Sequence, residues 1–481
     1  MSDSLIQAGA TPADVPDITP VASENQHAGA ALLSRMECVP HSAWHRRARI
    51  IMGSATFFDA FSALSLAFVL PTLIGAWHIT PAEVGVLIGS GYLGQLVGAL
   101  GFGWLAERRG RVRSATYAVT LMSVMGLACA FAHSFMALLI YRIVQGVGVG
   151  GEVPVAATYI NELSRAKGRG RFFMLYELIF PLGLMATGLI GAWLVPRLGW
   201  QTMFVLGAVP GLIIAVLISR LAESPRWLIQ KGRFDDAERV VENIEASTSV
   251  RLSQAPAAEA PVRHARADVG EKQGGVLKVI LSKAYRSRTL IVWLLWATSY
   301  FIANGVNNWM PTIYKTVYHL PLADALKAAS LNNVGHVCAA IACAFVVDRF
   351  GRRWWTVAAL AVVALTFGFL GFGGTTSIGW VVGLVVVAYG MTGSINNLLY
   401  LYTPEIYPTR IRAVATSVAT AWLRLSSAVA PALVGLFMSG SGIELMYATF
   451  AVVAVIGAVG AVWMIETRER SLESITVAGV S

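Results

Sequence analysis

The sequence predicts an all-α membrane protein with twelve transmembrane helices in two six-helix halves. The first observation is composition: of 481 residues, 56% are hydrophobic and only 13% are charged, about half the charged fraction of a typical soluble protein. The second is a series of apolar stretches of about 18 residues or more, the length that crosses a bilayer as a helix. The third is a pair of charged patterns that recur about half a chain apart, which indicates an internally duplicated protein.

Twelve apolar stretches separated by polar turns are the predicted transmembrane helices. Glycines inside them do not argue against helix, because membrane helices use small residues where they pack closely. The glycine-rich segment 146–154 interrupts one such stretch, whereas a nucleotide-binding glycine loop follows a strand and opens a helix. The predicted spans are residues 50–76, 84–106, 114–132, 135–161, 172–195, 201–220, 289–312, 325–347, 354–374, 378–402, 413–438 and 443–465.

Two charged patterns mark the duplication. The turn GWLAERRGRVR contains Glu107, and the turn VVDRFGRR contains Asp348, 241 residues later. The segments YINELSRAKGR and YTPEIYPTRIR contain Glu162 and Glu405, 243 residues apart, and in each an arginine follows the glutamate by seven positions. All four patterns stand where apolar stretches end. This arrangement is typical of a membrane transporter built from two related halves.

The basic residues predict the orientation in the membrane. With both termini inside the cell, 32 of the 37 lysines and arginines lie in cytoplasmic segments. Arg197, Lys315 and Lys327 lie on the other side, and Arg142 and Arg424 lie within spans. This asymmetry follows the positive-inside rule. It also accounts for the net charge of +10 without nucleic-acid binding, because the basic residues are distributed between spans rather than gathered on one soluble face.

Outside the spans, the chain has two tails and a central loop. The first tail is polar and irregular and shows no cleavable signal pattern. The loop begins with helical periodicity, from Trp227 to Ile244, and continues as an alanine- and proline-rich linker. The four cysteines lack metal-binding or redox spacing, which predicts packing roles and no metal site. The predicted parts are the N-terminal tail 1–49, the N-terminal half 50–220, the central loop 221–288, the C-terminal half 289–465 and the C-terminal tail 466–481.

Several motifs resemble those of the major facilitator superfamily, over nearly the whole chain. The repeated G-x-L-[DE]-R-x-G-R-R turn is that superfamily's signature. The motifs ESPRW at 223–227, PEIYPTRIR at 404–412 and ETRERSLESI at 466–475 resemble its metabolite:proton symporter branch, which includes bacterial nicotinate and aromatic-acid carriers and is related to sugar porters and organic-ion transporters. The segments SRMECVPHSAWHRR at 34–47 and FFDAF at 57–61 fit the same branch.

The resemblance implies the major facilitator fold, transport by alternating access, and a central cavity lined by the first, fourth, seventh and tenth spans. Two positions depart from the pattern of the family. Glu107 stands where the family usually has aspartate. Ser62 stands where aromatic-acid carriers commonly have a second aspartate, which weakens the case for an aromatic acid as substrate.

Ionisable residues inside spans are functional candidates, because a charge in the bilayer is costly. Asp59, flanked by phenylalanines, is the first candidate for carrying a coupled proton, since apolar surroundings disfavour the charged form of a carboxyl group. The alternative is a permanent pair with an arginine. Arg142 and Arg424 either hold an anionic substrate or neutralise Glu152 and Asp59. The proton-coupling candidates are Asp59, Glu152, Glu177 and His336, although a lone histidine in a span more often bonds a neighbouring helix.

Asparagines cluster in two predicted spans. Asn304, Asn307 and Asn308 lie at i, i+3 and i+4, on one helix face. Such a face either joins helices or lines a polar cavity. Because the resemblance places the seventh and tenth spans beside the cavity, we expect a cavity lining. The candidate substrate-binding residues are Arg142, Arg424, Asn304, Asn307, Asn308, Asn396 and Asn397.

The repeated acids and arginines at the cytoplasmic ends of spans predict a gate. Ion pairs there would hold when the cytoplasmic side is closed and break when it opens. The alternative, that they are orientation signals, explains the arginines but not the matched acids. The gate candidates are Glu107, Arg108, Arg111, Glu162, Arg169, Glu223, Arg226, Asp348, Arg349, Arg352, Glu405 and Arg412.

These patterns predict a secondary transporter that carries a small organic metabolite, with an organic or aromatic acid favoured, together with a proton. The alternatives are a facilitator or proton-driven exporter of sugars, organic cations or drugs, and a metabolite-sensing receptor. No nucleophile–base, metal-ligand or phosphate-cradle pattern indicates an enzyme, and no cofactor is expected. We expect a monomeric, multi-pass protein of the inner membrane with both termini cytoplasmic, whose partners are substrate, proton and lipid.

Overall fold

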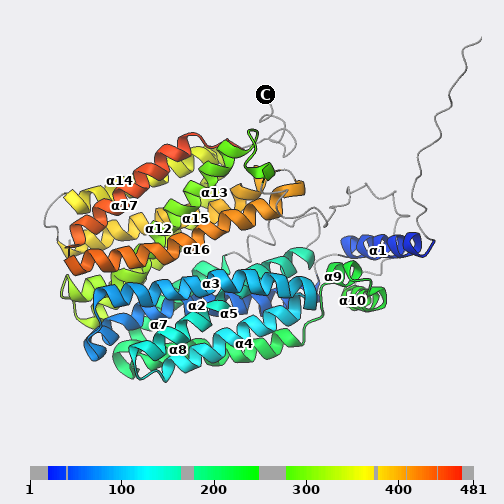
Figure 1. Cartoon of the computed structure of the whole chain (residues 1–481), viewed down its shortest axis with the longest axis horizontal. Coiled ribbons are helices and arrows are strands. Elements are labelled where there is room, and N and C mark those ends of the chain that lie inside the picture. Colours follow the sequence, from blue (N-terminus) through cyan, green and yellow to red (C-terminus); the bar gives the residue numbers. More distant parts are fainter. Residues whose placement is uncertain are drawn as a thin grey trace, which may run out of the picture.

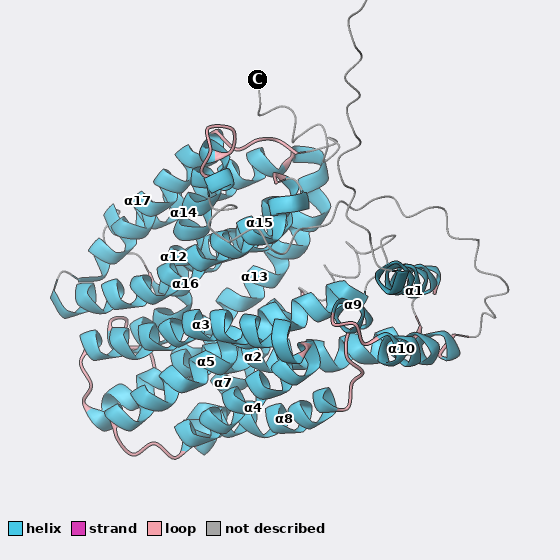
Figure 2. Cartoon of the chain, turned by 45° about the vertical axis from the view of Figure 1, so that its right-hand side comes forward, coloured by secondary structure: helices cyan, strands magenta, loops and turns pink. Residues whose placement is uncertain are grey.

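The computed structural model describes residues 20–39, 42–163, 178–248, 278–372, 377–407, 409–440 and 442–467. Throughout this part of the chain the regular structure is helical (Figure 2). Twelve of the helices described are long and apolar enough to cross a membrane, so the predicted fold class is confirmed.

The N-terminal half contributes six of these helices. Their ends lie within several residues of the predicted spans, except that the first helix begins seven residues early. The early start places polar residues in a helical turn before the apolar stretch, where Ser42 N donates to His45 Nδ1 at 3.3 Å. The first residues of the predicted span 172–195 lie outside the described residues. The helices are α2 (Ala43–Trp77), α3 (Pro81–Arg109), α4 (Arg111–Ala130), α5 (Phe135–Leu163), α7 (Ile179–Leu198) and α8 (Gln201–Ser219).

The C-terminal half repeats this arrangement with six helices. Its first helix, like that of the N-terminal half, extends beyond the apolar stretch and starts on basic residues. The helices are α12 (Arg286–Thr316), α13 (Leu322–Phe350), α14 (Arg352–Phe372), α15 (Ile378–Glu405), α16 (Thr409–Gly440) and α17 (Gly442–Val462).

Small residues explain how closely the helices of one half approach. A Cβ atom at Gly146 would collide with the carbonyl oxygen of Gly91, and one at Gly150 would collide with the backbone of Gln95. Glycine therefore lets the backbones of α5 and α3 come into contact, which is the packing role that small residues have in membrane helices. The glycine-rich segment is a helix-packing face, as its position within a span predicts.

The two halves lie side by side (Figure 1), and among the described residues their main contacts are three helix pairs: α2 with α12, α3 with α16, and α7 with α13. In each half the first helix meets the first helix of the other half, and the second meets the fifth. This exchange of second and fifth helices is what a two-fold relation between duplicated halves requires.

Among the described residues, the halves share a hydrophobic core at one end of the bundle but not at the other. At the end away from the basic turns, one continuous cluster joins residues such as Phe68 and Leu73 of α2 with Trp309 and Ile313 of α12. Lys315 Nζ there donates to the Pro71 carbonyl oxygen at 3.0 Å, across the two halves. At the end that carries the basic turns, each half has a separate core. The halves are therefore joined at one end and packed independently at the other.

Three helices that are not among the twelve candidate membrane spans form a cap beside the N-terminal half: α1 (Pro20–Cys38), α9 (Pro225–Gln230) and α10 (Phe234–Ala246), seen together at one end of the molecule in Figure 1. Their apolar faces form one cluster that includes Leu32 and Trp227, and Arg35 Nη2 lies 2.9 Å from Glu245 Oε2. The predicted helical periodicity of the loop is confirmed. The prediction of an irregular N-terminal tail is wrong for α1, because its helix is stabilised by packing on α10 rather than by an apolar stretch of its own.

Candidate functional site

A buried cavity of about 150 Å³ lies between the halves. Helices α2, α3, α5 and α7 of one half and α12, α13, α15 and α16 of the other contribute to its wall. This composition agrees with the expected four cavity helices and adds four more. The polar lining residues are Thr56, Asp59, Tyr92, Gln95, Tyr300, Asn304, Asn307, Asn308, His336, Asn396, Asn397, Tyr400, Arg424 and Ser427.

Asp59 projects from α2 into this cavity and is 1% exposed. Its Oδ1 atom has no hydrogen-bond partner among the described residues. The charged groups that act on it are Glu152 of α5 and Arg424 of α16. One turn away on the same face of α2, Thr56 donates its hydroxyl to Glu152 Oε1 at 3.0 Å. The site thus places two carboxyl groups on the N-terminal half opposite one cation on the C-terminal half.

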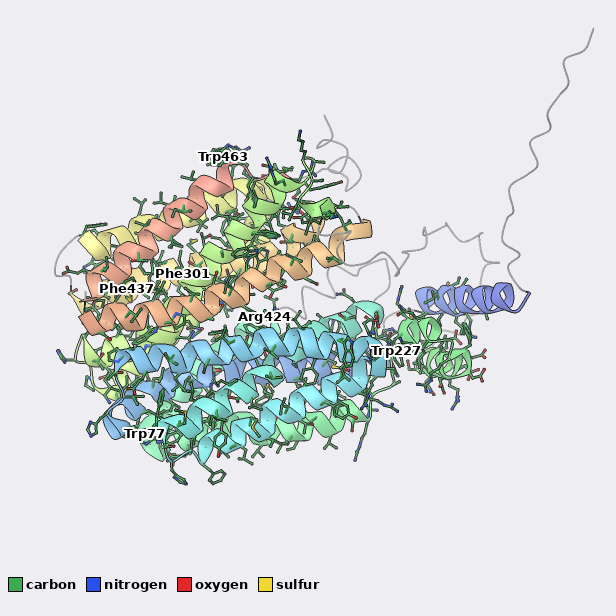
Figure 3. All side chains as sticks on the ribbon, in the orientation of Figure 1. Trp77, Trp227, Phe301, Arg424, Phe437 and Trp463 are labelled. Carbon is green, nitrogen blue, oxygen red and sulfur yellow. The ribbon has the colours of Figure 1, made fainter. Side chains whose placement is uncertain are left out.

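Arg424 lines the cavity from the opposite side. Figure 3 places it where α16 faces the N-terminal half. Its only hydrogen bond within the described structure is a long one, from Nη1 to the Thr420 carbonyl oxygen at 3.5 Å, and its Nε is buried without a hydrogen-bond partner. A guanidinium group has five N–H donors in a planar fork. Most of those donors remain available to an anion in the cavity.

An aromatic wall stands beside Arg424. The Tyr300 and Tyr400 rings line the cavity with it, and both pack on the fully buried Trp296. The Trp296 and Tyr300 rings are stacked, with centroids 5.4 Å apart, whereas Tyr400 meets Trp296 edge-on at 4.8 Å. This rigid aromatic surface next to a cation suits a flat, negatively charged ligand.

Arg142 is buried behind the cavity wall and makes a different set of contacts. Its Nη1 donates to Gln145 Oε1 at 2.7 Å and to the Ser62 carbonyl oxygen at 3.2 Å. Within the described part of the chain it forms no ion pair, so neither Glu152 nor Asp59, the two expected partners, neutralises it in this state. Of the two intramembrane arginines, Arg424 is the one in the cavity wall.

The predicted amides divide into two groups. Asn304 accepts a hydrogen bond from the Tyr92 hydroxyl and donates to Ser427 Oγ at 2.8 Å. Asn308 Nδ2 donates to the same Tyr92 hydroxyl at 3.2 Å. These bonds tie α12 to α3 of the other half. Tyr92 was missed by the sequence reasoning, because a single tyrosine in an apolar span carries no periodic signal.

Asn396 is also committed to the protein, since it accepts a hydrogen bond from the Ser299 hydroxyl. By contrast, the side chains of Asn307 and Asn397 line the cavity and make no hydrogen bond to any other described residue. The expectation that the amides line the cavity therefore agrees with the position of all five. Only Asn307 and Asn397, however, have side chains with no hydrogen bond to another described residue.

His336 of α13 is held in place by packing. The Tyr389 ring meets it edge-on at a centroid distance of 5.7 Å, and a Cβ atom at position 393 would collide with the imidazole ring, so Gly393 makes the space it occupies. The Gly393 backbone lies close to the ring, but its geometry does not satisfy either ring nitrogen, and both are buried without a hydrogen-bond partner in the described structure.

The gate candidates of the N-terminal half form one cluster. Arg111 Nη2 lies 2.9 Å from both Glu107 and Glu162. Glu223 Oε1 accepts the backbone N–H of Arg111 at 2.9 Å and that of Val112 at 3.2 Å, at the N-terminus of α4. Burial raises the pKa of Glu223 above its ordinary value, while these N–H groups and the Arg111 charge act in the opposite direction. The cluster fixes the turn between α3 and α4 to the segment that follows α8.

The C-terminal half contains the same arrangement. Glu466 accepts the backbone N–H groups of Arg352 at 3.0 Å and Arg353 at 3.1 Å, at the N-terminus of α14. It lies 243 residues after Glu223, the offset of the second repeated pattern, so the sequence contained a signal for this missed residue. Arg352 Nε lies 3.8 Å from Glu405 Oε2. Each of these acid–arginine contacts joins elements of a single half.

The other gate candidates are more dispersed. Arg226 Nε donates to the Glu162 carbonyl oxygen at 2.9 Å, and Arg108 stacks on the Trp104 ring at 4.1 Å. Arg412 Nε donates to the Tyr407 carbonyl oxygen at 3.3 Å. Arg349 lies in the last turn of α13. The side chain of Asp348 and the residues Arg169 and Glu177 lie outside the part of the structure that is described.

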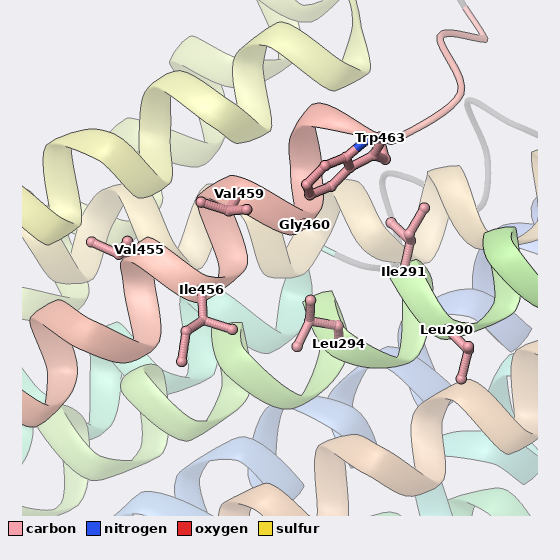
Figure 4. A pocket seen from close by; sticks show the side chains of 8 residues that line it. All are labelled: Leu290, Ile291, Leu294, Val455, Ile456, Val459, Gly460 and Trp463. Atoms are coloured by element: carbon pink, nitrogen blue, oxygen red, sulfur yellow. The ribbon is translucent and has the colours of Figure 1, made fainter.

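A second concave surface lies on the outside of the bundle, between α12 and α17 (Figure 4). Its walls are entirely apolar, with Leu294 on one side and Val459 and Trp463 on the other. Trp463 is 64% exposed. A groove of this composition on the outer face of a membrane bundle suits lipid chains, and its one side-chain hydrogen-bond donor is the Trp463 indole N–H.

Twelve membrane-spanning helices in two related halves around a buried polar cavity define the class: a multi-pass membrane transporter. Comparison with known proteins agrees. The family profile described as "Sugar (and other) transporter" matches residues 39–478. The chain belongs to this family of the major facilitator superfamily. Among its structural relatives, the xylose transporter XylE from E. coli in an inward-open conformation aligns with a TM-score of 0.68 and 18% identity, over 89% of this chain and 98% of that chain.

Curated relatives are similar in sequence over most of the chain. The niacin transporter NiaP of Acinetobacter baylyi is 31% identical over 458 residues, which cover 92% of this chain and 99% of that protein. The 4-hydroxybenzoate transporter PcaK of Pseudomonas aeruginosa is 31% identical over 317 residues, covering 65% of this chain and 68% of that protein. The metabolite-transporter family expected from the motifs is therefore confirmed, together with a multi-pass location in the bacterial inner membrane.

Proposed function

We propose that the protein takes up a small aromatic carboxylate together with a proton, by alternating access. The observation that carries this proposal is Arg424, a guanidinium group in the cavity wall with most of its donors available. It stands beside Tyr300 and Tyr400, which offer a surface for a flat ring. Similarity to transporters named for niacin, 4-hydroxybenzoate and gallate supports the same substrate class.

Proton coupling follows from the charges around the cavity. Two neighbouring carboxyl groups of the N-terminal half, Asp59 and Glu152, interact with each other, and Arg424 of the C-terminal half acts on Asp59. A substrate carboxylate that binds Arg424 removes the cation that acts on Asp59. Asp59 then faces Glu152 alone, and two like charges in an apolar site favour uptake of a proton by one of them. Anion and proton would thus load together, with Asp59 as the carrier and Glu152 as the neighbouring acid.

The charge distribution supports an orientation with both termini and the cap of α1, α9 and α10 in the cytoplasm. The shared core then closes the periplasmic side, and the separate cores lie on the cytoplasmic side, which corresponds to an inward-facing state. Alternating access requires the shared contacts, such as the bond from Lys315 to Pro71, to break when the periplasmic side opens. The cavity is complete within one chain, which supports a monomer as the functional unit. We propose that this unit performs transport rather than catalysis.

Uptake in proteoliposomes tests this proposal. Purified protein is reconstituted, and radiolabelled nicotinate, 4-hydroxybenzoate, a sugar and an organic cation are supplied with and without an inward proton gradient. We expect gradient-driven accumulation of the carboxylates only. Arg424→Gln should abolish this uptake while Arg197→Gln, a change at an arginine outside the cavity, should leave it intact. Accumulation of the sugar or the cation, or carboxylate uptake that ignores the gradient, would contradict the proposal.

A further inference from the structure

We infer that His336, with Asn307 and Asn397, forms a second substrate subsite that recognises a hydrogen-bonding group on the aromatic ring. This inference rests on the proposed function, in which Arg424 binds the carboxylate. The substrate would then be an aromatic acid with a second polar group, such as a ring nitrogen or a hydroxyl. Benzoate, which has the carboxylate and the ring but no such group, would be a poor substrate.

The position of the His336 ring is determined by the protein. Tyr389 holds one edge, and Gly393 leaves the space that the ring occupies. Such packing on two sides fixes the direction in which the ring nitrogens point. A group fixed in this way before the ligand arrives loses little conformational entropy on binding, which is the basis of preorganised recognition.

The polar atoms of the same ring are left unsatisfied. His336 is 6% exposed, lines the cavity, and has no hydrogen bond at either nitrogen in the described structure. A buried polar group without a partner is unfavourable, and native proteins satisfy nearly all of them. A neutral imidazole offers one donor and one acceptor. Both are therefore available to a ligand that enters the cavity.

The cavity asparagines differ in whether the protein already satisfies their side chains. Asn304, Asn308 and Asn396 have protein partners, while Asn307 and Asn397 have none among the described residues and still line the cavity. An amide can donate and accept. Together with the imidazole, the two amides can bind either an acceptor such as a pyridine nitrogen or a donor such as a phenol.

The two subsites lie on different walls of the cavity. Arg424 comes from α16, which packs on α3, whereas His336 comes from α13, which packs on α7; α12, which carries Asn307, packs on both α16 and α13. A planar ring between them would present its carboxylate to one wall and its second polar group to the other. The cavity volume of about 150 Å³ is below the roughly 300 Å³ at which pockets for drug-sized ligands begin, which favours a single small ring.

The test compares two substrates in two proteins. Initial uptake of nicotinate and benzoate is measured in proteoliposomes for the native protein and for His336→Phe, which keeps a flat ring but has no polar atoms. In the native protein, kcat/KM for nicotinate should exceed that for benzoate by about 10- to 100-fold, the effect of one unsatisfied buried hydrogen bond. In His336→Phe this ratio should fall close to one, mainly through loss of nicotinate uptake.

Controls separate recognition from folding. Benzoate uptake by His336→Phe reports whether the variant is folded, and His336→Gln, which restores a donor and an acceptor, should recover part of the ratio. His133→Phe, a histidine exposed outside the cavity, should leave the ratio unchanged. Equal uptake of both acids by the native protein, or an unchanged ratio in His336→Phe, overturns the subsite while the proposed function stands. Absence of uptake for every carboxylate overturns the proposed function and the subsite with it.

Discussion

Replacing Asp59 by asparagine tests whether this carboxyl group carries the coupled proton. The substitution keeps the size of a side chain that is 1% exposed, and it removes the ability to ionise. Of the three ionisable groups that interact here, Asp59, Glu152 and Arg424, it removes one carboxyl group. Without a titrating group at this position, substrate binding at Arg424 no longer drives proton uptake. Substrate transport would then no longer be coupled to the proton gradient.

The magnitude follows from the gradient itself. A symporter that moves one proton with each monovalent anion converts an inward gradient of one pH unit into about tenfold accumulation, because one pH unit corresponds to about 1.4 kcal/mol. Asp59→Asn should reduce this tenfold accumulation to equilibration, a ratio of about one. Exchange of labelled for unlabelled substrate needs no net proton movement, so we expect it to persist in the variant.

The assay is counterflow and gradient-driven uptake in the same proteoliposome preparation. Asp324→Asn is the matched control, because Asp324 pairs with Lys327 at 3.1 Å on the surface of α13, away from the cavity. The control should accumulate substrate like the native protein. If Asp59→Asn still concentrates substrate tenfold, the reasoning is refuted, and Glu152 and then Glu177 become the candidates for the proton site.

Three further predictions concern the gate, the repeated helix caps and the orientation. Glu405→Ala should lower the uptake rate severalfold without loss of membrane insertion, and exchanging the charges of Arg352 and Glu405 should restore part of it; a normal rate in Glu405→Ala would exclude this pair from the cycle. Glu466→Ala should lower the unfolding free energy by about 1–3 kcal/mol, because two N–H groups at the start of α14 lose their acceptor. Chemical denaturation measures this loss, and the control is Glu444→Ala, which removes an acid from the first turn of α17. Cysteines introduced at residues 20, 260 and 475 should resist an impermeant thiol reagent applied to intact cells, and labelling at 260 from outside would reverse the proposed orientation.

The sequence predicted the duplicated gate chemistry but not all of its partners. The 243-residue offset links Glu162 to Glu405, and the same offset links Glu223 to Glu466. In the structure, Glu223 and Glu466 accept backbone N–H groups at the start of equivalent helices. Only the first of these two was selected from the sequence, because Glu466 stands in a C-terminal tail rather than in a recognisable turn.

The ion pairs of the gate show a limit of reasoning from spacing. Glu405 and Arg412 are separated like Glu162 and its following arginine, which suggested a direct role for the spacing. The described contacts of Arg412 run instead to the Tyr407 carbonyl oxygen, while Glu405 lies near Arg352 and accepts the Thr467 hydroxyl. For two side chains seven positions apart across a helix boundary, the backbone of the intervening turn determines which residues each one contacts.

The sequence by itself determined the class of fold, the number of spans and the duplication. These properties depend on the length of apolar stretches relative to the bilayer and on the spacing of charges along the chain, and both can be read from the linear order of residues without knowing which helices pack together. Tertiary structure alone decided which polar residues are available to a ligand. Asn304 and Asn307 are one turn apart on the same face of α12. A tyrosine and a serine from two other helices form hydrogen bonds with the Asn304 side chain, whereas the Asn307 side chain remains available to a ligand. Hydrogen bonding inside a membrane protein is satisfied between helices far apart in the sequence, so the binding surface exists only once the two halves have packed.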